Sequence, residues 1–154
     1  MLTDILRREY IQVNVESENF EDAIVKSLNP LLLNGAVTDK YVEKILEIYR
    51  ETGPYIVITK SVALPHAPSE FGVKKLALGL TILKEPVVSG HETNDPVKYL
   101  FSLSSPDSNQ HLIVISQLVQ LLSNDEFIEK LSKANDVEIV EGLLREYEGD
   151  VENE

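Results

Sequence analysis

The sequence predicts an α/β fold, in which a mixed sheet of about five strands is flanked by helices on both faces. Three observations lead to this prediction. Apolar residues recur with helical spacing towards both ends of the chain, and short strand-like runs occupy its middle. The loops that join successive strand-like runs are too short for helical crossovers, so the sheet is expected to be mixed.

The first third of the chain predicts a strand followed by two helices. Residues 10–15 alternate between apolar and polar side chains, which is the period of a half-buried strand. Ser17 is expected to cap a helix whose apolar positions run from Phe20 to Leu32. Thr38 is expected to cap the next helix, which ends at Gly53 and the proline after it.

The middle of the chain predicts four strands, at residues 55–59, 62–64, 76–83 and 97–104. Each is a short apolar or alternating run bounded by turn residues. Residues 76–83 are apolar on both faces, which is typical of a central strand.

The last third predicts three helices. The first, from His111 to Leu122, is nearly all apolar and is expected to be buried on most sides. Ser123 and Asn135, each followed three residues later by a glutamate, are expected to begin the other two. We expect a single domain over residues 1–147 and an acidic tail, 148–154, that frays.

The composition excludes several classes of protein. Of the 154 residues, 43% are hydrophobic and 26% charged, as in a globular domain. The absence of cysteine excludes disulfides, thiolate zinc sites and iron–sulfur clusters. A net charge of −12 argues against nucleic-acid binding, and no apolar run is long enough for direct membrane insertion. The N-terminus lacks the apolar core of a signal peptide, so we expect a cytoplasmic protein.

Common catalytic and cofactor motifs are also missing. The chain has no glycine-rich phosphate loop, no dinucleotide-binding fingerprint and no serine nucleophile elbow. Its histidines do not have the spacing of a zinc site. The sequence therefore predicts no cofactor and no metal.

Three histidines are candidates for chemistry. His66 stands between two prolines at the end of a predicted strand, where a restricted backbone presents an imidazole that can act as a nucleophile. His111 lies at the start of a predicted helix, where backbone N–H groups attract anions and a neutral imidazole can donate to a phosphoryl group. Each also admits a purely structural interpretation, as a loop histidine or a partner of nearby backbone. His91 lies in a polar loop, where a solvated side chain is the default.

Several features of the sequence resemble one family. The run Val62-Ala63-Leu64-Pro65-His66 is similar to the Ala-x-Pro-His box of the enzyme IIA domains of the mannitol–fructose class of the phosphotransferase system. His111 heads an apolar helix, as does the family histidine that sits beside the phosphorylated one. Gly53-Pro54-Tyr55 and Asn94-Asp95-Pro96-Val97 resemble the ascorbate-type branch more narrowly, and the resemblance covers nearly the whole chain.

The resemblance implies a phosphocarrier. In this family the small carrier HPr donates a phosphoryl group, and a cysteine of a partner IIB component accepts it. His66 would take the group on Nε2, and His111 would stabilise it. The membrane component IIC would be reached only indirectly, for uptake of ascorbate or a related sugar. The oligomeric state stays open, a homodimer included.

The docking face should surround His66 with apolar residues that exclude water from the complex. The expected members are Ala67, Pro68, Phe71 and Val73. Three other functions stay open at this point: a regulatory module whose phosphorylation state controls another protein, a hydrolase or metal-binding module using His66 and His111, and a scaffold without chemistry.

Overall fold

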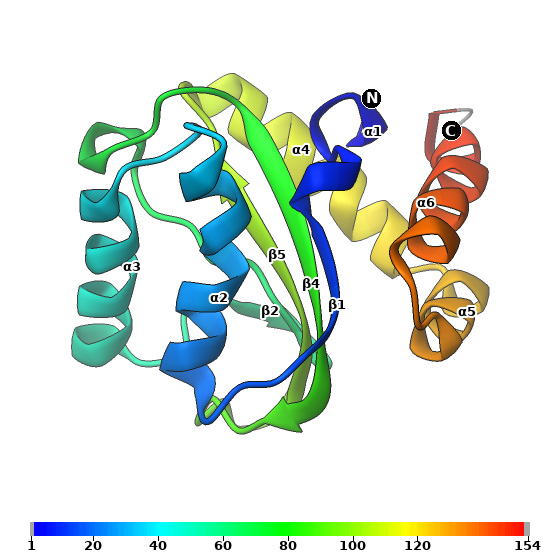
Figure 1. The fold of residues 1–154 in the computed structure, drawn as a ribbon, viewed down its shortest axis with the longest axis horizontal. Helices are drawn as coiled ribbons and strands as arrows, with labels where there is room; N and C mark the ends of the chain where they lie inside the picture. The colour runs from blue at the N-terminus through cyan, green and yellow to red at the C-terminus, as the bar shows by residue number, and fades with distance from the viewer. Residues whose placement is uncertain (1, 153–154) are drawn as a thin grey trace.

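The computed structural model describes residues 2–152, with side chains described up to Glu148 (Figure 1). The helices are α1 (Leu2–Ile5), α2 (Phe20–Leu33), α3 (Asp39–Thr52), α4 (Ser108–Leu122), α5 (Asp125–Lys133) and α6 (Val137–Glu152). The strands are β1 (Ile11–Val15), β2 (Val57–Thr59), β3 (Val62–Ala63), β4 (Ala77–Val87) and β5 (Val97–Ser104). Two short 3-10 helices complete the chain, η1 (Arg8–Tyr10) and η2 (Ser69–Phe71).

The strands form one mixed sheet in the order β1-β4-β5-β3-β2. β1 is parallel to β4 and β3 is parallel to β5, whereas the β4–β5 and β2–β3 pairs are antiparallel. Residues Ala77 to Leu83 of β4 are all buried, as expected of a strand covered on both faces. The predicted fold class is therefore confirmed.

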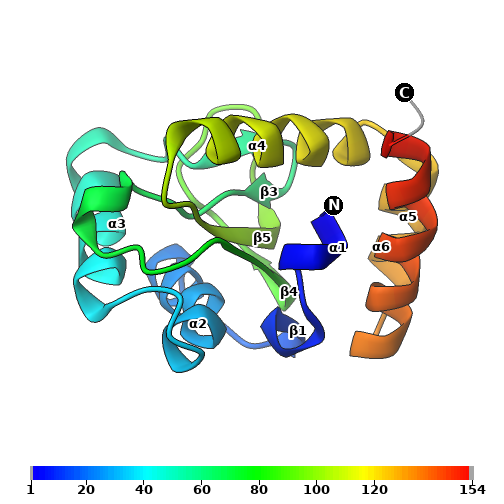
Figure 2. The ribbon, with the colours of Figure 1, turned by 90° about the horizontal axis from the view of Figure 1, so that it is seen from above.

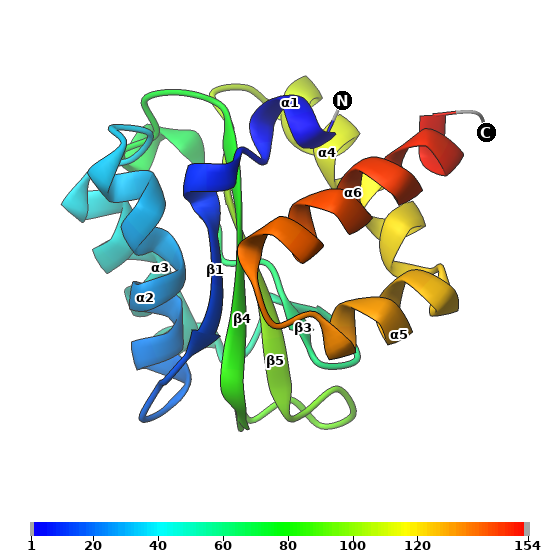
Figure 3. The same cartoon turned by 45° about the vertical axis from the view of Figure 1, so that its right-hand side comes forward.

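Helices cover both faces of the sheet (Figure 2). α2 and α3 pack on one face, where the largest fully buried side chains are Phe20, Ile24, Leu28, Leu31, Tyr41 and Ile45. α1, α4, α5 and α6 lie over the other face, and their buried residues include Leu2, Val114, Leu118, Phe127, Leu131 and Val140 (Figure 3). The sheet therefore separates two apolar cores.

Three helices begin one or two residues later than the sequence predicts. Asn19, Asn124 and Asp136 cap α2, α5 and α6, in place of Ser17, Ser123 and Asn135. In each case the side-chain oxygen accepts a hydrogen bond from the N–H three residues on, at 2.8, 3.1 and 2.8 Å respectively. These predictions were wrong because several capping residues stand side by side, and only this geometry selects among them.

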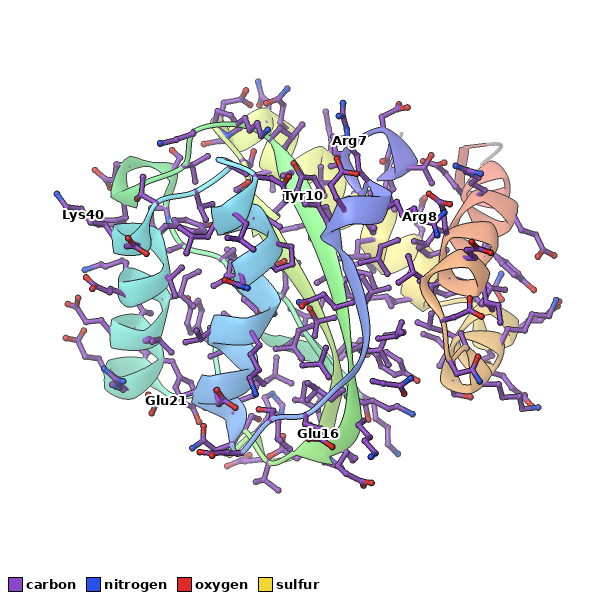
Figure 4. The ribbon with its side chains drawn as sticks, viewed as in Figure 1. Arg7, Arg8, Tyr10, Glu16, Glu21 and Lys40 are labelled. Carbon is purple, nitrogen blue, oxygen red and sulfur yellow. The ribbon has the colours of Figure 1, made fainter. Side chains whose placement is uncertain are left out.

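The two ends of the chain meet on one side of the sheet. The short helix α1 was not predicted from the sequence; its Leu2 is buried, and the helix contacts α6. Thr3 of α1 donates hydrogen bonds to the Glu148 carboxylate from both its backbone N–H and its hydroxyl. Arg8 extends towards α6 and forms an ion pair with Glu138 at 3.1 Å (Figure 4). α6 continues past residue 147, the expected end of the domain, to Glu152, and the last two residues of the tail that was expected to fray lie outside the described residues.

α4 departs most from its prediction. It begins at Ser108 rather than at His111, because Asp107 caps it by accepting a hydrogen bond from Gln110 N–H at 2.8 Å. Burial on most sides was wrong, since only Val114, Leu118 and Leu121 are buried. Across residues 2–152, no helix has the length and apolar character needed to cross a bilayer.

Candidate functional site

The candidate site lies where two adjacent parallel strands end. β3 pairs with β5 in parallel, with Val62 opposite Tyr99 and Ala63 opposite Leu100. The chain leaves β3 through a short segment to His66, and it leaves β5 through a turn into α4. Because parallel strands end at the same edge of a sheet, these two segments meet there. The ring centroids of His66 and His111 are 5.2 Å apart.

The segment that carries His66 is fixed by backbone hydrogen bonds on both sides. Leu64 N–H donates to the carbonyl of Ile56 at 2.7 Å, and Leu103 N–H donates to the carbonyl of Pro65 at 3.0 Å. The segment is therefore held between the start of β2 and the end of β5. A fixed backbone of this kind suits a nucleophile, because a reaction becomes slower when the reacting group is misplaced.

The His66 ring has a defined tautomer. Its Nδ1 lies 2.6 Å from the carbonyl oxygen of Leu64, which can only accept. Nδ1 therefore carries the proton, and Nε2 keeps its lone pair. Burial lowers the pKa of His66 below its ordinary value of 6.5; the bond to Leu64 opposes this shift and His111 adds to it.

His111 is the fourth residue of α4, in its first turn. Burial lowers the pKa of its imidazole too, which favours the neutral form beside the positive end of the helix dipole. Among the described residues, none forms a hydrogen bond with either of its ring nitrogens. A neutral His111 can therefore donate one hydrogen bond to a group bound beside His66.

A cavity of about 390 Å³ opens beside the two imidazoles. Its other lining residues are the hydroxyl-bearing Tyr55, Ser69, Ser105 and Ser108, the carboxyl-bearing Asp107, and the apolar Ala67, Pro68 and Leu112. None of the described lining residues is a lysine or an arginine. No cluster of three or more metal-ligating side chains occurs within the described part of the chain. The site thus offers an anion neutral hydrogen-bond donors and the start of α4, where the Asp107 carboxylate already caps Gln110 N–H.

The structure divides the four expected docking residues into two pairs. Ala67 and Pro68 line the cavity directly after His66. Phe71 lies away from it, with its ring 4.5 Å from Lys44 Nζ of α3, and lines a separate cavity there. Val73 forms an isolated bridge with Val37.

Two lining residues, Tyr55 and Leu112, were not among the candidates predicted from the sequence, and His91 is less exposed in its polar loop than predicted. Tyr55 lines the cavity from the turn before β2, and Leu112 lines it from α4. The sequence carries no signal for Leu112, because α4 is apolar on nearly every side and only the fold shows which face is exposed. His91 is half-buried and organises its loop, because its Nδ1 accepts hydrogen bonds from the N–H groups of Thr93 and Asn94 at 3.2 Å.

Comparison with known proteins places this geometry in a family. Residues 4–147 match the family described as phosphoenolpyruvate-dependent sugar phosphotransferase system, EIIA 2. The chain is 35% identical over 122 residues to the ascorbate-specific PTS system EIIA component of Shigella boydii, covering 79% of each chain. The Escherichia coli K12 counterpart is 34% identical over the same share of both chains.

Solved structures agree with the sequence relatives. The mannitol-specific cryptic phosphotransferase enzyme IIA of Escherichia coli superposes with a TM-score of 0.84 at 29% identity, over 93% of this chain and 97% of the other. Enzyme IIA of the mannitol system, solved in complex with phosphorylated enzyme IIB of Escherichia coli, gives a TM-score of 0.78 at 27% identity, over 91% and 96% of the two chains. This chain therefore belongs to the EIIA 2 family of the sugar phosphotransferase system.

Proposed function

We propose that the protein is a phosphocarrier in which His66 accepts a phosphoryl group from phospho-HPr and passes it to a cysteine of a IIB component. The observation that carries this proposal is the His66 tautomer. The bond from Nδ1 to the Leu64 carbonyl leaves the lone pair on Nε2, in a ring that lines the cavity. The lowered pKa keeps that lone pair unprotonated at neutral pH.

The transfer would proceed by two in-line displacements. Nε2 of His66 attacks the phosphorus, the bond between phosphorus and the donor histidine breaks, and the donor imidazole keeps the electron pair. The positive charge that forms on the His66 ring is stabilised by the bond from Nδ1–H to Leu64. In the second step a IIB thiolate attacks the phosphorus, and the electron pair of the broken bond returns to Nε2.

His111 and the start of α4 would stabilise the transferred group. Phosphoryl transfer spreads charge over the equatorial oxygens, so positioned donors contribute much of the catalysis. The neutral imidazole of His111 is such a donor, together with the first-turn N–H groups of α4 that are not bonded to Asp107. No metal is required, because the group moves directly between protein nucleophiles.

The docking face would surround the mouth of the cavity. Ala67, Pro68 and Leu112 form its apolar part next to His66, whereas Phe71 and Val73 do not line this cavity. A IIB component is the expected occupant, because the enzyme IIA of the mannitol system was solved with its phosphorylated IIB partner. The ascorbate-specific relatives favour ascorbate or a chemically similar sugar as the transported substrate.

The test is the intact mass of the protein after incubation with phosphoenolpyruvate, enzyme I and HPr. Wild type and the His91→Ala control should gain one acid-labile phosphoryl group, and His66→Ala should gain none. His111→Ala should gain and lose the group more slowly. The proposal is wrong if wild type gains no mass while a known enzyme IIA is labelled in the same mixture.

A further inference from the structure

The peptide group that follows His66 is held at both of its polar atoms. Tyr55 Oη donates to the carbonyl oxygen of His66 at 2.6 Å. The N–H of Ala67 donates to Tyr41 Oη at 3.0 Å. That carbonyl and that N–H belong to one planar peptide unit, so two phenol groups together fix its orientation.

Tyr41 reaches this peptide from α3. The side chain is only 1% exposed, and its hydroxyl proton is donated to the carbonyl of Leu103 at 2.7 Å. Leu103 lies at the end of β5, from which the chain continues into α4 and His111. One buried hydroxyl therefore joins the segment that carries His66 to the strand that leads to His111.

Tyr55 reaches the same peptide from the cavity. Its ring lines the cavity, and its centroid lies 5.9 Å from that of His66. Burial raises the pKa of Tyr55 to about 12, so its hydroxyl stays protonated and remains a hydrogen-bond donor at neutral pH.

We propose that Tyr41 and Tyr55 are positioning residues that keep the His66 ring in its reactive tautomer and orientation. The bond from Nδ1 to the Leu64 carbonyl spans only two residues, so it depends on the local backbone of residues 64–67. Pro65 and Pro68 restrict φ at their own positions, but they leave ψ of His66 free. The peptide unit held by the two tyrosines sets that angle. The rate prediction rests on the proposed role of His66, whereas the spectroscopic one does not.

The experiment compares Tyr41→Phe, Tyr55→Phe and Tyr49→Phe. Tyr49 is the matched control, because its hydroxyl also donates to a backbone carbonyl, that of Ser89, at 2.7 Å, and it does not line the cavity. The first readout is the ¹⁵N spectrum of the unphosphorylated imidazoles. Wild type and Tyr49→Phe should show His66 as one tautomer with the proton on Nδ1, whereas the other two variants should show a mixture.

The second readout is the single-turnover rate of phosphoryl transfer from phospho-HPr. Tyr41→Phe and Tyr55→Phe should be slowed by about 10-fold or more, as expected when a reacting group is misplaced, and Tyr49→Phe should match wild type. Circular dichroism checks that each variant folds. If Tyr41→Phe does not fold, the two readouts of Tyr55→Phe, whose side chain is partly exposed, test the positioning role by themselves.

The two possible failures are distinguishable. A single His66 tautomer and a wild-type rate in Tyr55→Phe would overturn the positioning role. The other failure would be a tautomer mixture in Tyr55→Phe while neither wild type nor any of the three variants is phosphorylated. That result would support the positioning role and overturn the phosphocarrier proposal.

Discussion

Burial and one hydrogen bond set the protonation of His66. Removing an imidazole from water disfavours its charged form, and this is the largest cause of its lowered pKa. The Leu64 carbonyl raises the pKa, because its hydrogen bond with Nδ1–H is stronger when the ring is charged than when it is neutral. The neutral ring therefore carries its proton on Nδ1, which faces the Leu64 carbonyl, and keeps its lone pair on Nε2.

We expect the acceptance of phosphoryl groups by His66 to resist acid better than a free imidazole would. The rate should decline at a lower pH than it would for an imidazole with the ordinary pKa of 6.5, because Nε2 is protonated only as the pH approaches the lowered pKa. An NMR titration of the His66 ring gives the midpoint directly, without interference from titration of the donor. A midpoint at or above 6.5 would contradict this expectation.

The lowered pKa of His66 should also make the stability of the protein depend on pH. The folded state holds fewer protons on His66 than the unfolded state does, so the free energy of unfolding decreases as pH falls from 6.5 towards the lowered pKa. Urea unfolding of wild type and His66→Gln over this range measures the effect, and the decrease should be smaller in the variant.

At the level of single residues, the flanking prolines and the place after a strand made His66 a candidate, and the resemblance to the family singled it out. Its relation to His111 could not be deduced, because it depends on β3 pairing in parallel with β5 although β4 lies between them in the chain. Tyr41 and Tyr55 gave no signal either. Their role comes from hydroxyl groups that reach a peptide distant in sequence.

α4 shows why the burial of a helix is difficult to predict from its sequence. Its sequence is nearly all apolar, which predicts burial on most sides, yet the sheet and α6 contact one stripe of it. Leu112 and Ile113 are 65% and 53% exposed, and Leu112 also lines the cavity. A run of apolar residues gives no indication of which face meets a neighbour, so the exposed face became visible only in the fold.

We expect this exposed face of α4 to contribute to docking. Leu112→Asp should leave the free energy of unfolding within about 0.5 kcal/mol of wild type, because the side chain is mostly in water. It should slow phosphoryl transfer to a IIB component by about 10-fold or more, because a charge at the mouth of the cavity would be desolvated on docking.

The matched control for this test is Ile139→Asp, which places the same charge at a 47% exposed isoleucine on α6. Its transfer rate should equal that of wild type. Equal rates for Leu112→Asp and Ile139→Asp would exclude α4 from the docking face.

At the scale of the whole molecule, stability depends on how closely the neighbouring segments pack against the central strand β4. Gly79 lies in the fully buried part of β4, beneath α2 and beside the end of η1. A Cβ at this position would lie 2.5 Å from Ser102 Oγ, 3.0 Å from Leu31 Cδ1 and 3.1 Å from the carbonyl oxygen of Tyr10. A continuous apolar run predicted the strand, but it could not predict this close approach, which involves three separate segments.

Gly79→Ala should therefore destabilise the protein by about 1–3 kcal/mol, since the serine and leucine side chains can move but the Tyr10 backbone is held in place. Gly142→Ala provides the opposite case, because a Cβ there meets nothing within 4 Å in the middle of α6. That change should stabilise the protein by about 0.5–1 kcal/mol through the helix preference of alanine. Urea unfolding of both variants measures the two free energies. If Gly79→Ala has the same free energy of unfolding as wild type, the neighbouring segments can move apart to admit a methyl group without loss of stability. The close packing around Gly79 would then not contribute measurably to the stability of the fold.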